Sequence, residues 1–176
     1  LLDEPFSAVD RSTRKRLYIE LLRLHEQLAA TVLLVTHDLD EAAQLASHLL
    51  LLRHGRIVQS GATSEVLTRP TSEEAARLLD IPNIFTARVD GTASGRNLRL
   101  RWGPHALRAT GPLPAGIEGD LRWAILPSNV LLVRPDKPWG SHLENPLLVI
   151  VEEVIEMGTE AVVRLQPQGL SEARLQ

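Results

Sequence analysis

The pattern of hydrophobic and polar positions changes once along the chain, near residues 80–84. Before that point, apolar residues recur at helical spacing or gather in short runs, as they do where helices and strands alternate. The run TVLLVT at residues 31–36 is rich in β-branched residues and predicts a buried parallel strand. A helix over residues 12–29 is predicted by four leucines that share one face: Leu17, Leu21, Leu24 and Leu28.

Capping and turn residues mark the elements that follow in this first part. Asp38 and Glu41 have the spacing of a capping box and predict a helix through about residue 46. Thr71 and Glu74 repeat that spacing. The remaining predicted elements are a strand end at residues 1–2, a hairpin of strands 49–53 and 56–59 around the turn His54–Gly55, and helices at 63–68 and 71–79.

After residue 84 the helical periodicity stops, and short alternating segments appear between glycines and prolines. Leu121, Trp123 and Ile125 alternate with their neighbours as in a half-buried strand. Strands are predicted at residues 85–89, 97–102, 106–109, 120–126, 130–133, 147–156 and 161–166. This part therefore indicates an all-β barrel or sandwich, into which residues 170–176 should also pair. Its tryptophans are expected in the core or at a subunit interface: Trp102, Trp123 and Trp139.

Composition narrows the possible functions. No cysteine is present among the 176 residues, which excludes disulfides, iron–sulfur clusters and thiolate-bound zinc. The net charge of −3, the lack of a basic stripe and the few aromatic residues argue against nucleic-acid binding. No apolar run approaches the roughly 20 residues that span a bilayer. The first residues do not resemble a signal peptide.

Polar residues that follow two predicted strands form a candidate catalytic site. Asp3 and Glu4 are adjacent acids that could divide two tasks, since one can hold Mg²⁺ through water while the other orients and deprotonates an attacking water. His37 follows the strand at 31–36 and could donate a hydrogen bond to a terminal phosphate. Taken singly, the acids are equally consistent with a solvated strand exit, and His37 with an ordinary surface histidine.

The order of the motifs is more specific than any one of them. Leu-Leu-Asp-Glu-Pro at 1–5 is followed by Ser-Ala-Val-Asp at 7–10, a long helix, an apolar strand and Thr-His-Asp at 36–38. This set resembles the Walker B motif, D-loop and H-loop of the nucleotide-binding subunits of ATP-binding-cassette (ABC) transporters. The hairpin at 54–57 fits the usual continuation of that family, so the resemblance covers residues 1–80.

The resemblance implies two cofactors, ATP and Mg²⁺, and a role for each site residue. Asp3 would hold Mg²⁺ through water, Glu4 would be the general base, and His37 would sense the γ-phosphate. Ser7 and Asp10 would lie at the contact between two ATPase subunits, which in this family form a head-to-tail dimer around ATP.

Other motifs of the family do not occur in these 176 residues. There is no Gly-x-x-x-x-Gly-Lys-Ser/Thr loop (Walker A), no Q-loop and no Ser-Gly-Gly signature. By the resemblance, the chain corresponds to the C-terminal portion of a longer protein. We therefore predict that on its own it neither binds ATP tightly nor hydrolyses it.

The β-rich part resembles the TOBE or MOP domain of import ATPases, a small barrel similar to the oligonucleotide-binding (OB) fold. The resemblance lies in Asn-Ile-Phe at 83–85, in residues 125–132, and in the stretch that contains Ser141 and Asn145, which is most like molybdate-importer ATPases. The implied fold is the C-terminal part of a P-loop α/β domain with a mostly parallel sheet at residues 1–82. An all-β OB-like barrel follows at residues 83–176. Because the chain stops just after the segment at 170–176 begins, we expect further residues or a partner chain to complete the barrel.

Ser141 and Asn145 have two interpretations. Hydroxyl, amide and backbone N–H groups can bind a tetrahedral oxyanion without full positive charge. Ser and Asn are also common turn formers, which gives the pair a purely structural role.

The leading hypothesis is an ATP-hydrolysing, energy-coupling subunit of an ABC importer for molybdate or a related oxyanion. Its implied partners are a second identical ATPase subunit, membrane permease subunits and, indirectly, a periplasmic solute-binding protein. They would place it in the cytoplasm, peripheral on the inner face of the cell membrane. The alternative is an oxyanion-binding or regulatory dimerisation module without catalytic activity. The β-rich tail argues against a third class, ABC ATPases that serve no transporter.

Overall fold

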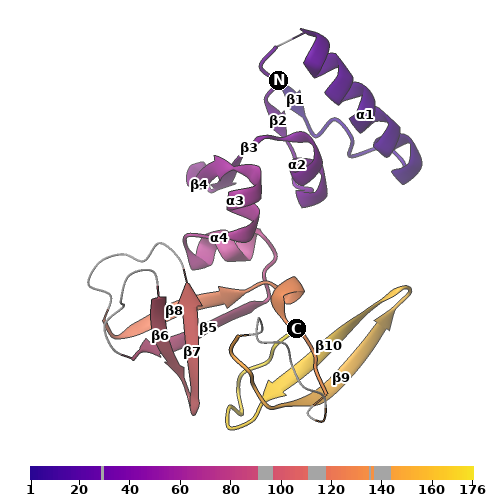
Figure 1. Cartoon of the computed structure of the whole chain (residues 1–176). Coiled ribbons are helices and arrows are strands. Elements are labelled where there is room, and N and C mark those ends of the chain that lie inside the picture. Colours follow the sequence, from indigo (N-terminus) through magenta and orange to yellow (C-terminus); the bar gives the residue numbers. More distant parts are fainter. Residues whose placement is uncertain (29, 91–96, 111–117, 135, 137–143) are drawn as a thin grey trace. The chain divides into compact units, whose positions relative to one another are not determined.

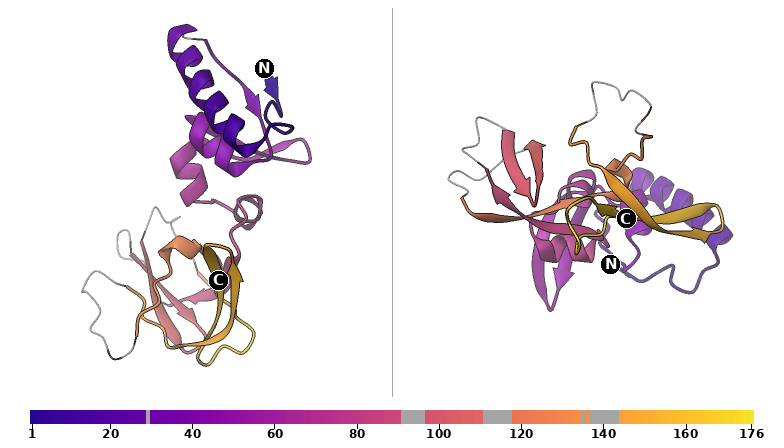
Figure 2. Two further views of the ribbon diagram at one scale, coloured as in Figure 1. Left: turned by 90° about the vertical axis from the view of Figure 1, so that its right-hand side faces the viewer. Right: turned by 90° about the horizontal axis from the view of Figure 1, so that it is seen from below.

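The computed structural model describes residues 1–28, 30–90, 97–110, 118–134, 136 and 144–176. The chain divides into two compact units, Leu1–Leu79 and Asp80–Gln176, each visible in Figures 1 and 2. The units are described separately below.

Helices and strands alternate in the first unit. Its elements are β1 (Leu2–Asp3), α1 (Arg11–Leu28), β2 (Leu34–Val35), α2 (Leu39–Leu45), β3 (His48–Arg53), β4 (Arg56–Ala62), α3 (Thr63–Thr68) and α4 (Glu73–Leu78). β1 and β2 pair in parallel, whereas β3 and β4 form an antiparallel hairpin in a separate two-stranded sheet. The predicted hairpin is confirmed, with both turn residues, His54 and Gly55, at positive φ (48° and 73°).

The mostly parallel sheet predicted for this unit is not confirmed. Parallel pairing in the described residues joins only Leu2 to Leu34 and Asp3 to Val35. A strand forms its ladder only where a neighbour runs beside it, so β2 covers two of the six residues predicted at 31–36.

The helix α1 has its predicted bounds to within one residue, but its leucine face is not a buried one. Leu17, Leu24 and Leu28 are 39%, 49% and 69% exposed, and the buried side chain of this helix is Tyr18. The Tyr18 ring meets Phe6 edge-on, with 4.9 Å between centroids. Periodicity located the helix correctly, while the face that packs within the described residues is the one that carries the aromatic residue.

Side-chain caps fix the starts of two helices. Asp38 caps α2 as predicted, since its Oδ1 accepts from the backbone N–H groups of Asp40 (2.8 Å) and Glu41 (3.2 Å). The cap of α4 is Ser72, not Thr71, and its Oγ accepts from the N–H of Ala75. Thr71 is engaged elsewhere, because its N–H and hydroxyl both donate to the side chain of Gln59.

The second unit is all-β. Its strands are β5 (Asn83–Val89), β6 (Asn97–Trp102), β7 (His105–Thr110), β8 (Asp120–Ile125), β9 (Val149–Met157) and β10 (Glu160–Pro167). Four of them form an antiparallel sheet in the order β7-β6-β5-β8, and β9 and β10 form a hairpin. Because the ladders of the described residues make two open sheets, the closed OB-like barrel is not confirmed.

The strand predicted at residues 130–133 is wrong. This stretch follows a 3₁₀ helix at Pro127–Asn129 and carries no ladder. The N–H of Val130 donates back to the carbonyl of Pro127, so local turn geometry takes the place of the strand that the apolar run suggested.

The core of the second unit lies between its two sheets. Leu98 and Leu100 of β6 are 1% and 2% exposed and share a cluster with Leu165 of β10. Phe85, Trp102 and Trp123 pack beside them in tilted and edge-on pairs, with ring centroids 4.6–5.2 Å apart. Trp102 and Trp123 are therefore core residues, as predicted. Trp139 lies outside the described residues.

The final residues of the chain are held by one fully buried amide. Asn83, 0% exposed, accepts from the N–H of Gln176 and donates to its carbonyl, both at 2.7 Å. The neighbouring Leu175 exchanges two backbone hydrogen bonds with Leu165. The last segment thus pairs into the unit, as predicted, through a side chain as well as through a ladder.

We expect Asn83→Ala to destabilise the second unit by about 1–3 kcal/mol, because it removes a fully buried amide and its two hydrogen bonds with the backbone of Gln176. Urea denaturation followed by tryptophan fluorescence measures the change, since all three tryptophans lie after residue 80. Asn97→Ala, at an exposed position of β6, is the matched control. Equal urea midpoints for the two variants would contradict a stabilising role of the contact between Asn83 and Gln176.

Candidate functional site

Glu4 stands directly after β1, at the point where the parallel pair ends. Its N–H donates to the carbonyl of Val35 (2.9 Å), which extends the pairing with β2 by one bond. Its own carbonyl accepts from the N–H (3.3 Å) and the hydroxyl (3.0 Å) of Ser7. These bonds hold both the N–H and the carbonyl of Glu4, and so fix the backbone that carries its carboxylate.

The backbone of Glu4 is strained. Its φ is +46°, in the left-handed region that costs a residue with a Cβ roughly 1–2 kcal/mol. Such residues persist where the surroundings over-determine them, and they cluster at functional sites. Here the hydrogen bonds to Val35 and Ser7 supply that constraint, so the direction of the Glu4 side chain is set by its backbone.

The structure brings Glu4 and His37 together. His37 follows β2 as Glu4 follows β1, and its Nδ1 lies 2.7 Å from Oε1 of Glu4. The histidine side chain is 79% exposed and the glutamate 36%. The hydrogen bond and the charge of Glu4 raise the pKa of His37 above its usual 6.5. In the protonated form Nδ1–H donates to the carboxylate, and Nε2–H remains to bind an anionic oxygen.

We expect the pKa of His37 in the folded chain to lie above 6.5 and to fall towards that value in Glu4→Gln. Because folding favours the protonated imidazole, the contact stabilises the fold below about pH 6.5. That contribution is lost as the pH rises through the raised pKa. Titration of the histidine ring by NMR measures the pKa of His37 in the unmodified chain and in Glu4→Gln. Asp3→Asn, which removes the same charge one residue earlier, is the control and should have a smaller effect.

Ser7 and Asp10, the two residues expected at a subunit contact, lie in the turn between β1 and α1. Asp10 caps α1, accepting from Ser12 Oγ (2.7 Å), Ser12 N (3.0 Å) and Thr13 N (3.1 Å). The Ser12 hydroxyl first, and then the N–H of Thr13, hold the pKa of Asp10 well below its usual range. Ser7 is exposed and bonds to Glu4. The structure therefore gives both residues local roles, and their contact with a second subunit stays a prediction.

Asp3 presents an exposed carboxylate at the end of β1. Within the described part of the chain, no three His, Cys, Asp or Glu residues gather as a metal cluster. A carboxylate oxygen with open space around it fits Mg²⁺, which binds proteins through one or two carboxylates and takes its other ligands from water and substrate phosphates. This exposed carboxylate does not suit an ion that takes all of its ligands from the protein.

Asn145 lies in the second unit and is engaged with backbone. Its Oδ1 accepts from the N–H of Arg108 (2.6 Å) and its Nδ2 donates to the carbonyl of the same residue (2.9 Å). Its φ of +55° lies in the left-handed region, which asparagine tolerates better than most residues. These contacts support the structural interpretation of Asn145. Ser141 lies outside the described residues, so the oxyanion interpretation of the pair stays a prediction.

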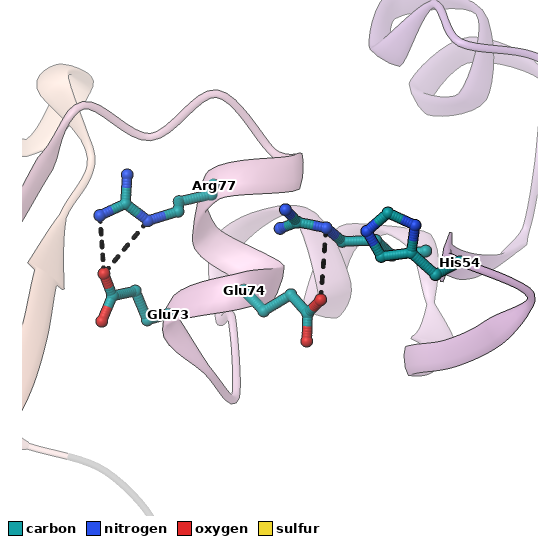
Figure 3. Close-up of a pocket in the computed structure, with 5 residues that line it drawn as sticks. His54, Glu73, Glu74 and Arg77 are labelled. Carbon is teal, nitrogen blue, oxygen red and sulfur yellow. Dashed lines mark hydrogen bonds and ion pairs between the residues drawn. The ribbon is translucent and has the colours of Figure 1, made fainter.

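A shallow pocket of about 430 Å³ lies between the β3–β4 turn and α4 (Figure 3). Both acids that line it already face arginines: Glu73 lies 2.7 Å from Arg77, and Glu74 lies 3.4 Å from Arg53. Paired charges of both signs select no particular ligand, so we assign this pocket no function.

Sequence reasoning missed a group of residues behind the site. Glu41, expected to complete a capping box, is buried (3% exposed) and accepts instead from the hydroxyl of Thr36 at 2.6 Å. Arg14 of α1 donates to Asp38 at 3.3 Å and to the carbonyl of Val9 at 3.0 Å. The sequence contains one sign of this group. Glu41 stands at a position of α2 that faces the core, and a glutamate is stable there only when polar partners surround its carboxylate.

In the described residues, no helix is both long and apolar enough to cross a membrane.

Comparison with known proteins gives relatives along nearly the whole chain. The molybdate/tungstate import ATP-binding protein WtpC of Thermococcus kodakarensis is 38% identical over 159 residues, 89% of this chain and 44% of that protein. The Fe(3+) ions import ATP-binding protein FbpC of Streptomyces avermitilis is 37% identical over 168 residues, 96% of this chain and 44% of that protein. The relatives are import ATP-binding proteins. No family model matches the chain.

These relatives confirm the resemblance at the level of ABC importer ATP-binding subunits. Their names state different solutes, among them molybdate or tungstate, ferric ions and, for the CysA 2 protein of Chromobacterium violaceum at 33% identity, sulfate or thiosulfate. The chain spans less than half the length of the curated relatives it matches.

Proposed function

We propose that residues 1–79 supply the hydrolytic half of an ATP site in an ABC importer, where Glu4 activates the attacking water. The observation that carries the proposal is the 2.7 Å contact between Glu4 and His37 at the ends of two paired parallel strands. The relatives, which are import ATP-binding proteins, support it independently of the geometry.

The geometry suits proton abstraction from a water molecule. Oε1 of Glu4 is held by His37, so Oε2 is the oxygen that accepts a proton from water. The raised pKa of His37 favours the protonated imidazole, whose Nδ1–H donates to the Glu4 carboxylate. When the γ-phosphate arrives, Nε2–H of His37 donates to one of its oxygens and leaves the carboxylate beside the water.

Asp3 is the residue that would hold Mg²⁺, through water, next to the same phosphate. When bound, the ion neutralises negative charge that develops on the phosphate oxygens. Asp3 belongs to β1 itself, whereas Glu4 follows the strand with a φ of +46°, so the two carboxylates are carried by different backbone conformations.

The partners follow from the proposal. A second ATPase subunit would meet the exposed turn that carries Ser7 and Asp10, and permease subunits would dock on the ATPase at the membrane. A solute-binding protein would act indirectly, through the permease. Together these partners give a cytoplasmic protein attached to the inner face of the membrane.

We further propose molybdate or a related oxyanion as the solute. Three of the relatives are molybdate/tungstate import proteins, at 38%, 31% and 34% identity. Uptake of labelled molybdate, sulfate and ferric iron by cells that lack the gene separates the candidates. Loss of ferric uptake alone would overturn the oxyanion assignment and leave the ATPase assignment intact.

The ATPase proposal is tested in two preparations. Calorimetry on the 176-residue chain should detect no tight binding of MgATP, because the chain contains no phosphate-binding loop of the Walker A type. A chimera in which the preceding part of the Thermococcus kodakarensis relative is joined to Leu1 should hydrolyse ATP. A soluble chimera that binds ATP but does not hydrolyse it would contradict the proposal.

The alternative module function, oxyanion binding or regulatory dimerisation without catalysis, has less support. Asn145, one of its two candidate ligands, is engaged with the backbone of Arg108. Tight binding of molybdate by the 176-residue chain in the same calorimeter would favour it.

A further inference from the structure

A polar network next to His37 joins the turn before α1, the helix α1 itself and the turn before α2. Its members are Arg14, Thr36, Asp38 and Glu41. Arg14, in the first turn of α1, sends Nη2 to the carbonyl of Val9 (3.0 Å) and Nη1 to Oδ2 of Asp38 (3.3 Å). The same Nη1 lies 3.9 Å from Oε1 of Glu41. One guanidinium therefore contacts the turn before α1 and the turn before α2.

The Glu41 carboxylate is the buried centre of this network. Its side chain is only 4% exposed, so it needs partners on both oxygens. Oε2 accepts from the hydroxyl of Thr36 at 2.6 Å, and Oε1 faces Arg14. Tyr18, one turn along α1 from Arg14, is buried, and burial together with a hydrogen bond to Glu41 raises its pKa.

Thr36 carries the network to His37. Its hydroxyl donates to Glu41 and accepts from the N–H of Asp38 (3.0 Å), so it bonds to both sides of the turn in which His37 stands. Asp38 is fixed as well, because its Oδ1 caps α2 while its Oδ2 accepts from Arg14. Of the residues on either side of His37, Asp38 is thus tied to α1 directly, and Thr36 is tied to it through Glu41.

We propose that Arg14 is a positioning residue, which couples the segment Ser7–Asp10 to the turn that carries His37 through Asp38, Glu41 and Thr36. The inference rests on the proposed function, in which Ser7–Asp10 meets a second subunit. Arrival of that subunit would then shift Arg14, and through it the Glu4–His37 contact. A guanidinium suits the task because its planar fork reaches two acceptors in different directions, which a lysine ammonium does not reproduce.

The first test is made on the 176-residue chain and needs no ATPase activity. In Arg14→Gln the pKa of His37, followed by NMR, should fall, because the turn is no longer held against Glu4. The sign is diagnostic, since loss of a nearby positive charge alone would raise that pKa. The acidic groups that act on His37, namely Glu4, Asp38 and Glu41, are unchanged in this variant.

A second variant covers the case in which Arg14→Gln does not fold. Thr36→Val keeps the shape and every charge of the network but removes the hydroxyl that bridges Glu41 and Asp38, so it too should lower the pKa of His37. Arg16→Gln, an exposed arginine of the same helix, is the matched control and should leave the pKa where it is. An unchanged or raised pKa in both Arg14→Gln and Thr36→Val would overturn the inference.

Activity of the chimera separates this inference from the proposed function. Arg14→Gln should lower kcat between about tenfold and about 100-fold, with KM for ATP within about threefold, because misplacement of a catalytic group mainly affects the chemical step. Arg14→Lys should restore part of the loss. If Glu4→Gln abolishes turnover while Arg14→Gln leaves it intact, the proposed function stands and the inference fails. If Glu4→Gln has no effect, the proposed function fails.

Discussion

Replacing Glu4 by Gln in the chimera should reduce ATP turnover by at least about 100-fold, the scale on which a general base contributes. The amide keeps the size of the side chain and can still face His37, but it accepts no proton from water. ATP binding should stay within about threefold of the unmodified chimera, because Glu4 contacts the attacking water rather than ATP itself. Phosphate release under saturating ATP and binding of a fluorescent ATP analogue measure the two effects.

The control for this variant is Glu26→Gln, an exposed glutamate of α1. It removes the same charge from the same unit and should retain full turnover. If Glu4→Gln kept more than about half of the activity, the assignment of Glu4 as the general base would be wrong.

Truncating Leu98 to Ala should destabilise the second unit by about 2–5 kcal/mol. Leu98 is 1% exposed and lies in the cluster that joins the β5–β8 sheet to the β9–β10 hairpin. Loss of three side-chain carbon atoms leaves a cavity that the two sheets close only in part. The variant keeps all three tryptophans, so fluorescence in urea reports the unfolding of this unit directly.

Ile150→Ala is the matched control for the core variant. Ile150 is 55% exposed on β9, and its truncation should shift the free energy of unfolding by less than about 0.5 kcal/mol. Equal losses from Leu98→Ala and Ile150→Ala would mean that the core of this unit is not where the structure places it.

The meeting of Glu4 and His37 was predictable because each residue directly follows an apolar strand. Two parallel neighbours end at the same edge of a sheet, so residues that follow them meet there. Local signals also sufficed for α1, for α3, for the His54–Gly55 turn and for the cap of α2 by Asp38, each of which depends on residues a few positions apart.

What sequence reasoning missed depends on contacts between distant residues. Arg14 meets Asp38 across 24 positions, and no local pattern shows that the two lie together. The capping-box spacing at 38–41 was correct for Asp38 and wrong for Glu41, because a buried partner, Thr36, competes for its carboxylate. The apolar run at 130–133 suggested a strand, but a strand also needs a neighbour to pair with, which sequence alone does not locate.

The most direct test of the account is a crystal structure of the chimera with Mg²⁺, ADP and a planar fluoride mimic of the transferred phosphoryl group. If Glu4 is the general base, a water molecule lies within about 3 Å of its carboxylate, in line with the phosphoryl mimic. Nε2 of His37 then bonds to one of the equatorial atoms of that mimic. A structure in which the carboxylate of Glu4 points away from that water, with another side chain in its place, would contradict this assignment.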